Sequence, residues 1–165
     1  MRRTFIILLS IMTLWGVPCY GQPIDRERFE RLVAITKHFE GWHSQQRTPG
    51  YVGYGHQIQK GEYFPKTLTC QRADLLLRTD LLHHMRLYTR YGKDAYLLAA
   101  LSYNIGPAKL LGNDHYPKSN LLIRLEQGDR DILLLYLSYC KWKGRSKESI
   151  RRRRWVEYQL LFVER

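Results

Sequence analysis

The feature that most constrains the fold of this 165-residue chain is a glycine-rich segment at residues 41–65, where the helical spacing of apolar residues is lost. Glycine recurs at positions 41, 50, 53, 55 and 61, and the run from Tyr51 to Ile58 alternates as short strands do. A hairpin unit this small is not stable alone and must pack on a helix. The segment therefore predicts a small sheet lobe of two or three short strands supported by neighbouring helices.

Helical patterns lie on both sides of this segment. Residues 23–39 place Phe29, Leu32 and Val33 at helical spacing, and Gly41 is expected to end this helix after Glu40. After Pro65 the chain predicts further helices, each with a capping residue and a stop signal. Their expected bounds are Thr69 to about Tyr91 with a stop at Gly92, Asp94 to Ile105, Ser119 to near Gly128, Asp129 to Cys140 with a stop at Gly144, and Ser149 to Phe162.

Two of these helices have faces that the sequence assigns. The helix after Asp94 is apolar nearly all round and is expected at the centre of the bundle. In the last helix the apolar side chains are expected to face inward, while the run Arg151–Arg154 spreads around the circumference into solvent. These inward-facing side chains are Ile150, Trp155, Tyr158, Leu161 and Phe162. The expected class is α+β and mostly helical, with a cleft between the sheet lobe and the helical bundle.

The first residues predict export. Arg2 and Arg3 precede an apolar run from Phe5 to Val17, and small residues follow at the positions that a signal peptidase reads. We expect a signal peptide at residues 1–21, a single domain at residues 22–165, and a location in the periplasm or outside the cell. The apolar run is too short for a stable membrane anchor. Lipidation of Cys19 is the alternative.

The charge favours a polyanionic partner. The formal net charge is +12, and removal of residues 1–21 takes away only Arg2 and Arg3. A chain this basic associates with nucleic acid, with anionic lipid or with the bacterial wall. Because export argues against nucleic acid, we expect peptidoglycan as the partner.

We expect a monomer without metal or cofactor. Hydrophobic residues make up 44 % of the chain, which is enough for a core without a metal or a dense disulfide frame. Cys70 and Cys140 either pair outside the cytoplasm or remain free thiols. His83 and His84 are adjacent on a predicted helix, point in different directions, and therefore do not share a metal ion.

Glu40 is the strongest candidate for catalysis. It follows the apolar face of the first helix and stands between Phe39 and the pair Gly41 and Trp42. A carboxyl among apolar neighbours holds its proton to higher pH and can give it to a leaving oxygen. The alternative is an ordinary exposed Glu at the end of a helix.

Several motifs in order resemble the phage-type lysozymes, glycoside hydrolase family 24, with this chain as an exported bacterial member. They are "FEG" at Phe39–Gly41, "YVGYGH" at Tyr51–His56, "LTCQRADLLLRTDL" at Leu68–Leu81, "ALSYNIG" at Ala100–Gly106, "SNLLIRLEQGD" at Ser119–Asp129 and "KGRSKESIRRRRWVEYQLL" at Lys143–Leu161. The resemblance implies a muramidase that cuts the β-1,4 bond between N-acetylmuramic acid and N-acetylglucosamine.

The resemblance also implies roles for individual residues. Glu40 matches the catalytic acid, while His56 and Asp80 match a structural pair between the sheet lobe and the following helix. Asn104 and Ser119 match positions near the family's cleft. Beside these, Trp42 and Tyr54 are aromatic residues of the sheet lobe that are suited to stacking on sugar rings.

The chain departs from the family pattern at the second catalytic group. Phage members have an Asp shortly after the Glu and a Thr in the strand, whereas residues 42–60 contain no acidic residue and Tyr51 takes the place of the Thr. Three alternatives follow. The substrate's 6-hydroxyl attacks, as in a lytic transglycosylase; or His43, Gln45, Gln46, Thr48 or Tyr51 positions a water; or the protein binds glycan without cutting it.

Overall fold

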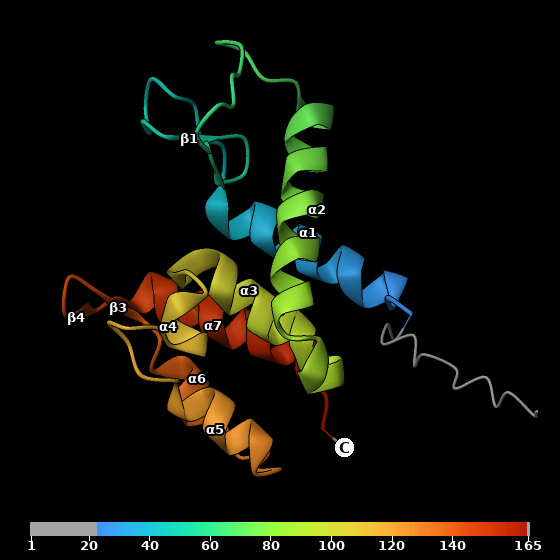
Figure 1. Cartoon of the computed structure of the whole chain (residues 1–165), viewed down its shortest axis with the longest axis vertical. Helices are drawn as coiled ribbons and strands as arrows, with labels where there is room; N and C mark the ends of the chain where they lie inside the picture. Colours follow the sequence, from blue (N-terminus) through green and yellow to red (C-terminus); the bar gives the residue numbers. More distant parts are fainter. Residues whose placement is uncertain (1–22, 165) are drawn as a thin grey trace, which may run out of the picture.

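The computed structural model describes residues 23–164, so the expected signal peptide at residues 1–21 and the alternative lipidation of Cys19 lie outside the described residues. The helices are α1 Arg26–Glu40, α2 Cys70–Leu87, the 3₁₀ helix η1 Thr89–Asp94, α3 Ala95–Ile105, α4 Ala108–Leu111, α5 Asn120–Glu126, α6 Leu133–Leu137 and α7 Glu148–Leu161. The strands are β1 Tyr51–Val52, β2 His56–Gln57, β3 Lys141–Trp142 and β4 Arg145–Ser146. Figure 1 shows a small sheet lobe at one end of a helical bundle.

The bundle is built around α3. Every residue from Ala95 to Ser102 is buried, and α1, α2 and α7 all pack on this helix. A helix that is apolar on all sides is most stable at the centre of the bundle, because neighbouring helices there remove its whole circumference from water. The expectation of a buried central helix is confirmed.

The sheet lobe is a minimal antiparallel hairpin. Tyr51 pairs with Gln57 and Val52 with His56, and an isolated bridge joins His43 to Gly53. Gly53 has a φ of 60°, and a Cβ at this position would lie 2.9 Å from the Cβ of Ala73 on α2. The absence of a side chain at residue 53 therefore lets the lobe approach α2, which runs from the sheet lobe to the bundle (Figure 1).

Some helix ends differ from the sequence-based expectation. Thr69 caps α2 as expected, but α2 ends at Leu87, and residues up to Asp94 form a 3₁₀ turn that is kinked at Gly92. Asp94 stands at the start of α3 without capping it. Its carboxylate instead accepts a hydrogen bond of 2.9 Å from Arg130, and this charge-assisted partner competes with the helix N–H groups.

The predicted helix from Asp129 to Cys140 is wrong at both ends. Asp129 accepts the N–H of Asp131 at 2.9 Å in a local turn, and α6 covers only Leu133–Leu137. The chain then forms the β3–β4 hairpin, with Lys141 opposite Ser146 and a turn at Lys143 and Gly144. The leucine run misled the prediction, because Leu134 is 76 % exposed and does not belong to a core face.

The last helix begins two residues earlier than expected and faces another way. Ser149 lies inside α7, and Lys147 precedes the helix without a side-chain cap. Trp155, expected inside, is 47 % exposed, whereas Arg153 and Arg154, expected in solvent, are buried. The physical reason is a buried acid, Glu157, which pairs with both guanidinium groups.

The two cysteines of the described chain do not pair. Cys70 is exposed, Cys140 is buried, and both are free thiols, so the alternative of a disulfide between them is wrong.

Within residues 23–164, none of the helices combines the length and the apolar character that a bilayer span requires.

Candidate active site

A cleft of about 780 Å³ lies between the sheet lobe and the helical bundle. Glu40 lines it at the end of α1, His43, Thr48 and Tyr51 line it from the sheet lobe, and Asp80, His83 and His84 line it from α2. The C-terminal end of α3, including Tyr103 and Asn104, forms another wall, and Trp142 reaches it from the β3–β4 hairpin. The cleft expected between the two lobes is therefore present.

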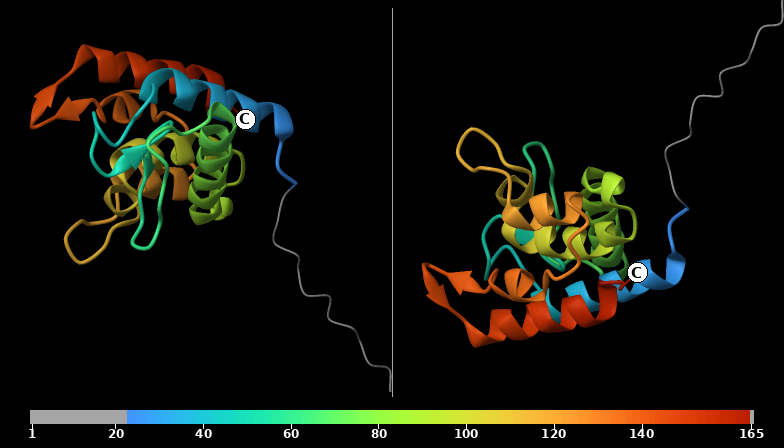
Figure 2. Two further views of the ribbon diagram at one scale, coloured as in Figure 1. Left: turned by 90° about the horizontal axis from the view of Figure 1, so that it is seen from above. Right: turned by 90° about the horizontal axis from the view of Figure 1, so that it is seen from below.

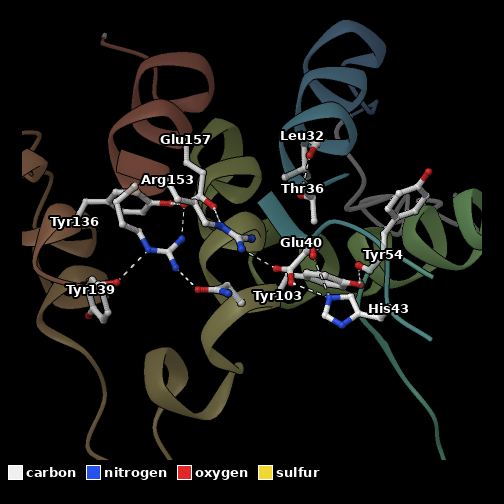
Figure 3. A network of polar contacts seen from close by, with 12 residues as sticks. Leu32, Thr36, Glu40, His43, Tyr54, Tyr103, Tyr136, Tyr139, Arg153 and Glu157 are labelled. Carbon is white, nitrogen blue, oxygen red and sulfur yellow. Dashed lines mark hydrogen bonds and ion pairs between the residues drawn. The ribbon is translucent and has the colours of Figure 1, made fainter. Parts of the chain in front are cut away.

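Glu40 is held by a partner from the far end of the chain. Its Oε1 accepts a hydrogen bond of 2.7 Å from Arg153 on α7, a residue 113 positions away (Figure 3). The side chain of Glu40 is 16 % exposed, and its other oxygen, Oε2, lies near His43 and Gly55. The carboxylate thus has one oxygen paired and one oxygen directed to the cleft side of the site. Its surroundings are more polar than the apolar neighbourhood expected from Phe39 and Trp42.

Arg153 belongs to a buried ionic network. Its Nε donates to Glu157 at 2.7 Å, and Glu157 also pairs with Arg154 and accepts the hydroxyl of Tyr136 at 2.8 Å. Burial alone lowers the pKa of Arg153, but the charges of Glu157 and Glu40 raise it above its usual value. Arg153 therefore remains a cation beside Glu40. The network balances two cations against two carboxylates, which is the condition under which buried charges are tolerated.

Arg154 extends this network to the cleft wall. Its guanidinium donates to the side-chain oxygen of Asn104, and its Nε donates to the carbonyl of Tyr139 at 3.1 Å. Asn104 was expected at the cleft and does line it. Its side-chain oxygen is engaged by Arg154, so the amide nitrogen is the group left to meet a ligand.

His43 and Thr48 form a small polar pair beside Glu40. His43 Nε2 lies 3.1 Å from the carbonyl oxygen of Glu40, and its Nδ1 lies 3.3 Å from Thr48 Oγ1. A carbonyl only accepts, so Nε2 carries a proton, and in a neutral imidazole the Thr48 hydroxyl then donates to Nδ1. His43 Nε2 is also 3.9 Å from Glu40 Oε2. The lone pairs of Thr48 Oγ1 remain able to accept hydrogen from a water molecule.

Other expected site residues lie elsewhere. Trp42 packs edge-on against Tyr54 with ring centroids 5.5 Å apart, and neither ring is among the cleft-lining side chains. Ser119 is buried and caps α5 by accepting the N–H of Leu122. Gln45 and Gln46 are exposed in the turn of the sheet lobe and do not line the cleft.

His56 connects the sheet lobe to α2 and has two acidic partners. Its Nδ1 is 2.8 Å from Asp80, as the resemblance implied, and its Nε2 is 3.0 Å from Glu62, a partner that the sequence did not indicate. Burial lowers the pKa of His56, but the hydrogen bonds to Glu62 and Asp80 outweigh it and raise the pKa above its usual value. The imidazolium is therefore stabilised at the junction of the two lobes.

The remaining histidine pair is structural. His84 Nδ1 lies 2.7 Å from Ser102 Oγ, and burial, with a smaller effect of His83, lowers the pKa of His84 to about 4. His84 is therefore a neutral imidazole in the wall of the cleft. Over residues 23–164, no group of three or more His, Cys, Asp or Glu side chains is arranged to hold a metal ion.

Gly55 makes room for the carboxylate. Its φ is 92°, and a Cβ there would lie 3.3 Å from Glu40 Oε2 and 3.5 Å from the ring of Tyr103. The Tyr103 hydroxyl donates to the carbonyl of Tyr54 at 2.9 Å, which ties α3 to the same loop. Gly55, Tyr103, Arg153 and Trp142 were missed in the sequence. The spacing of Glu157, four residues after Arg153, was the local signal for a paired arginine.

Comparison with known proteins bears on the fold. No model of a protein family matches the chain, and no curated protein does either. Among solved structures, the muramidase domain of SpmX from Asticaccaulis excentricus matches 87 % of this chain and 100 % of its own, with a TM-score of 0.65 and 23 % identity. The fold is lysozyme-like. In this lysozyme-like fold, the predicted arrangement of sheet lobe, cleft and helical bundle is confirmed.

Proposed function

We propose that this protein is a peptidoglycan glycosidase that cleaves the β-1,4 bond between N-acetylmuramic acid and N-acetylglucosamine, with Glu40 as the general acid. One observation carries the proposal: Glu40 lines the cleft with Oε1 held by Arg153, while its Oε2 has no hydrogen-bond partner within residues 23–164 and lies 3.9 Å from His43 Nε2. The lysozyme-like fold and the muramidase domain that it resembles support the substrate class.

The geometry supports a proton transfer from Oε2. Arg153 holds Oε1 at 2.7 Å, so the carboxyl group has a defined orientation before the sugar enters. As the glycosidic bond breaks, the proton on Oε2 moves to the leaving oxygen and leaves a carboxylate on Glu40. The guanidinium of Arg153 stabilises that carboxylate, and hence the charge that develops in the transition state.

Water is the proposed acceptor of the glycosyl group. A two-carboxylate mechanism lacks the second acid expected soon after Glu40, because residues 42–60 contain none, and Asp80 is paired through Oδ2 with His56. Thr48 Oγ1, bonded to His43 in the cleft that Glu40 also lines, is suited to accept a hydrogen bond from the attacking water. If Thr48 and His43 do not hold water, the 6-hydroxyl of the substrate attacks instead and the enzyme is a lytic transglycosylase.

A second candidate is a peptidoglycan-binding protein without turnover. Residues 42–60 supply no second carboxylate, and the ion pair with Arg153 gives Glu40 a place in the buried ionic network that needs no turnover. In either case we propose export by the signal peptide at residues 1–21 and action in the periplasm or outside the cell.

Digestion of purified sacculi separates these candidates. Mass spectrometry of the products reveals reducing ends for a hydrolase and 1,6-anhydro ends for a transglycosylase. Glu40→Gln should abolish new ends of either kind while the protein still sediments with sacculi. Glu27→Gln, on the exposed side of the same helix, is the matched control. Unchanged muropeptides with the intact protein on several mureins would leave only the binding candidate.

A further inference from the structure

The β3–β4 hairpin is a strongly cationic element. Within seven residues it and its flank carry four basic side chains, Lys141, Lys143, Arg145 and Lys147, and no acidic one. All four residues are exposed, and in the described part of the chain none of them forms an ion pair. This distinguishes them from Arg153 and Arg154, whose charges are neutralised inside the fold. The hairpin charges are therefore available to an external anion.

The same hairpin forms part of the cleft. Trp142 lines the cleft together with Glu40, yet it is 60 % exposed. An indole in this position offers an apolar face to a sugar ring. Figures 1 and 2 show the hairpin projecting at one end of the molecule, opposite the start of α1. Cations next to Trp142 thus lie beside whatever glycan occupies the cleft.

The base of the hairpin is anchored in the core. Cys140 is buried, its Sγ lies 3.2 Å from Ser146 Oγ, and its carbonyl accepts the N–H of Lys147 at 2.9 Å. Tyr139, the residue before Cys140, has its carbonyl bonded to the buried Arg154. The basic side chains therefore extend from a fixed support, which lowers the entropic cost of binding.

Lys143 occupies an unfavourable backbone conformation. Its φ is 48° and that of Gly144 is 78°, and Lys143 is the only non-glycine residue with a positive φ in residues 23–164. Tight hairpin turns of this kind favour Asn, Asp or Gly at that position. A lysine at the tip costs stability, which points to a functional reason for its charge.

We propose that this hairpin binds free carboxylates on the peptide side chains of the glycan in the cleft, so that the protein discriminates unamidated from amidated peptidoglycan. The inference rests on the proposed function for the identity of the glycan. Carboxylates form ion pairs with Lys and Arg, whereas a carboxamide is neutral and offers only a carbonyl oxygen without a net charge. Peptide carboxylates fit better than the phosphates of separate wall polymers, because the peptide is attached to the sugar that Trp142 faces.

The test compares two forms of one murein. Sacculi are treated with carbodiimide and ammonium to convert carboxylates to amides, and mock-treated sacculi serve as the reference. We expect the wild type to cleave amidated sacculi about threefold to tenfold more slowly at subsaturating substrate, as the loss of two or three exposed ion pairs predicts. Added salt should reduce the difference. A reference muramidase without such a hairpin controls for altered access to the glycan.

Paired variants assign the effect to the hairpin. Lys143→Gln combined with Arg145→Gln should raise KM on mock-treated sacculi to the value for amidated ones and leave kcat unchanged. Arg26→Gln combined with Lys93→Gln removes the same charge from the other end of the molecule, where both side chains are exposed, and should preserve the discrimination. A uniform loss in both double variants would reduce the effect to net charge and overturn the proposal.

Binding experiments separate this inference from the proposed function. Equal cleavage of both sacculi by the wild type overturns the hairpin's role and leaves the glycosidase intact. Absence of cleavage of either overturns the glycosidase, and sedimentation of the protein with the two sacculi then decides the hairpin's role. Tighter binding to mock-treated sacculi, abolished in the Lys143 and Arg145 double variant, supports it; equal binding overturns it.

Discussion

Glu40 and Arg153 show how a single pair of residues defines the candidate site. The guanidinium orients one carboxylate oxygen, and the other, Oε2, lies 3.9 Å from His43 Nε2 in the cleft. We expect Glu40→Gln to lower glycan cleavage by at least about a hundredfold, since a positioned general acid contributes that much or more. Muropeptide release by chromatography measures the effect. A Glu40→Gln protein that is folded by circular dichroism and cleaves at the wild-type rate would remove Glu40 from the mechanism.

Arg153 and Arg152 provide a test of buried charge within one run of arginines. Replacing Arg153 by Met leaves Glu40 without its cation and leaves Glu157 with Arg154 alone. This loss should lower the free energy of unfolding by about 3 kcal/mol. Arg152 is exposed, so Arg152→Met should change the free energy of unfolding by less than about 0.5 kcal/mol. Urea unfolding of the two variants supplies the comparison. Similar losses would mean that the network contributes little to stability.

At the scale of elements, the turn between β1 and β2 lies against the carboxylate of Glu40. Gly55 and Gly50 have nearly the same positive φ, 92° and 86°, but a Cβ at residue 55 would crowd Glu40 Oε2, while one at residue 50 meets nothing within 4 Å. Alanine at either position should cost about 1–2 kcal/mol through the backbone. Only Gly55→Ala should also reduce kcat, because it displaces the carboxyl group.

Thermal melts and steady-state rates on soluble glycan fragments measure the two glycine variants side by side. Equal activity in both would show that the turn acts through stability alone, and not through the position of Glu40. The comparison holds because both glycines have a positive φ, and they lie in the two turns that flank β1.

At the scale of the whole molecule, His56 joins the two lobes through Asp80 and Glu62. Its pKa in the folded protein is raised above the value of about 6.5 in an unfolded chain. Its contribution to stability is therefore complete below that pH and is lost as the pH rises through the raised pKa. We expect the wild type to lose more unfolding free energy than His56→Gln between about pH 6 and about pH 9.

Urea unfolding at the two pH values measures this difference. Asp80→Asn and Glu62→Gln should each reduce the pH dependence, because each removes one hydrogen bond that favours the imidazolium. Parallel curves for the wild type and His56→Gln would contradict a stabilising charge at this junction.

Local features of the sequence were sufficient for the outline of the fold. The glycine-rich segment predicted the sheet lobe, the apolar pattern predicted the central helix α3, and Thr69 and Ser119 predicted the starts of α2 and α5. The position of Glu40 at the end of α1 followed in the same way. Each of these signals acts between residues a few positions apart, where propensity and capping operate without the rest of the fold.

The candidate site was decided only by the tertiary structure. Four successive arginines look alike in the sequence, yet packing of α7 on α1 and α3 turns Arg153 and Arg154 inward and leaves Arg151 and Arg152 in solvent. The partner of Glu40 is 113 residues away, and Trp142 reaches the cleft from a hairpin that periodicity did not predict. A charge finds its partner where the packed elements bring it, because Coulomb attraction depends on distance in space and not on separation along the chain.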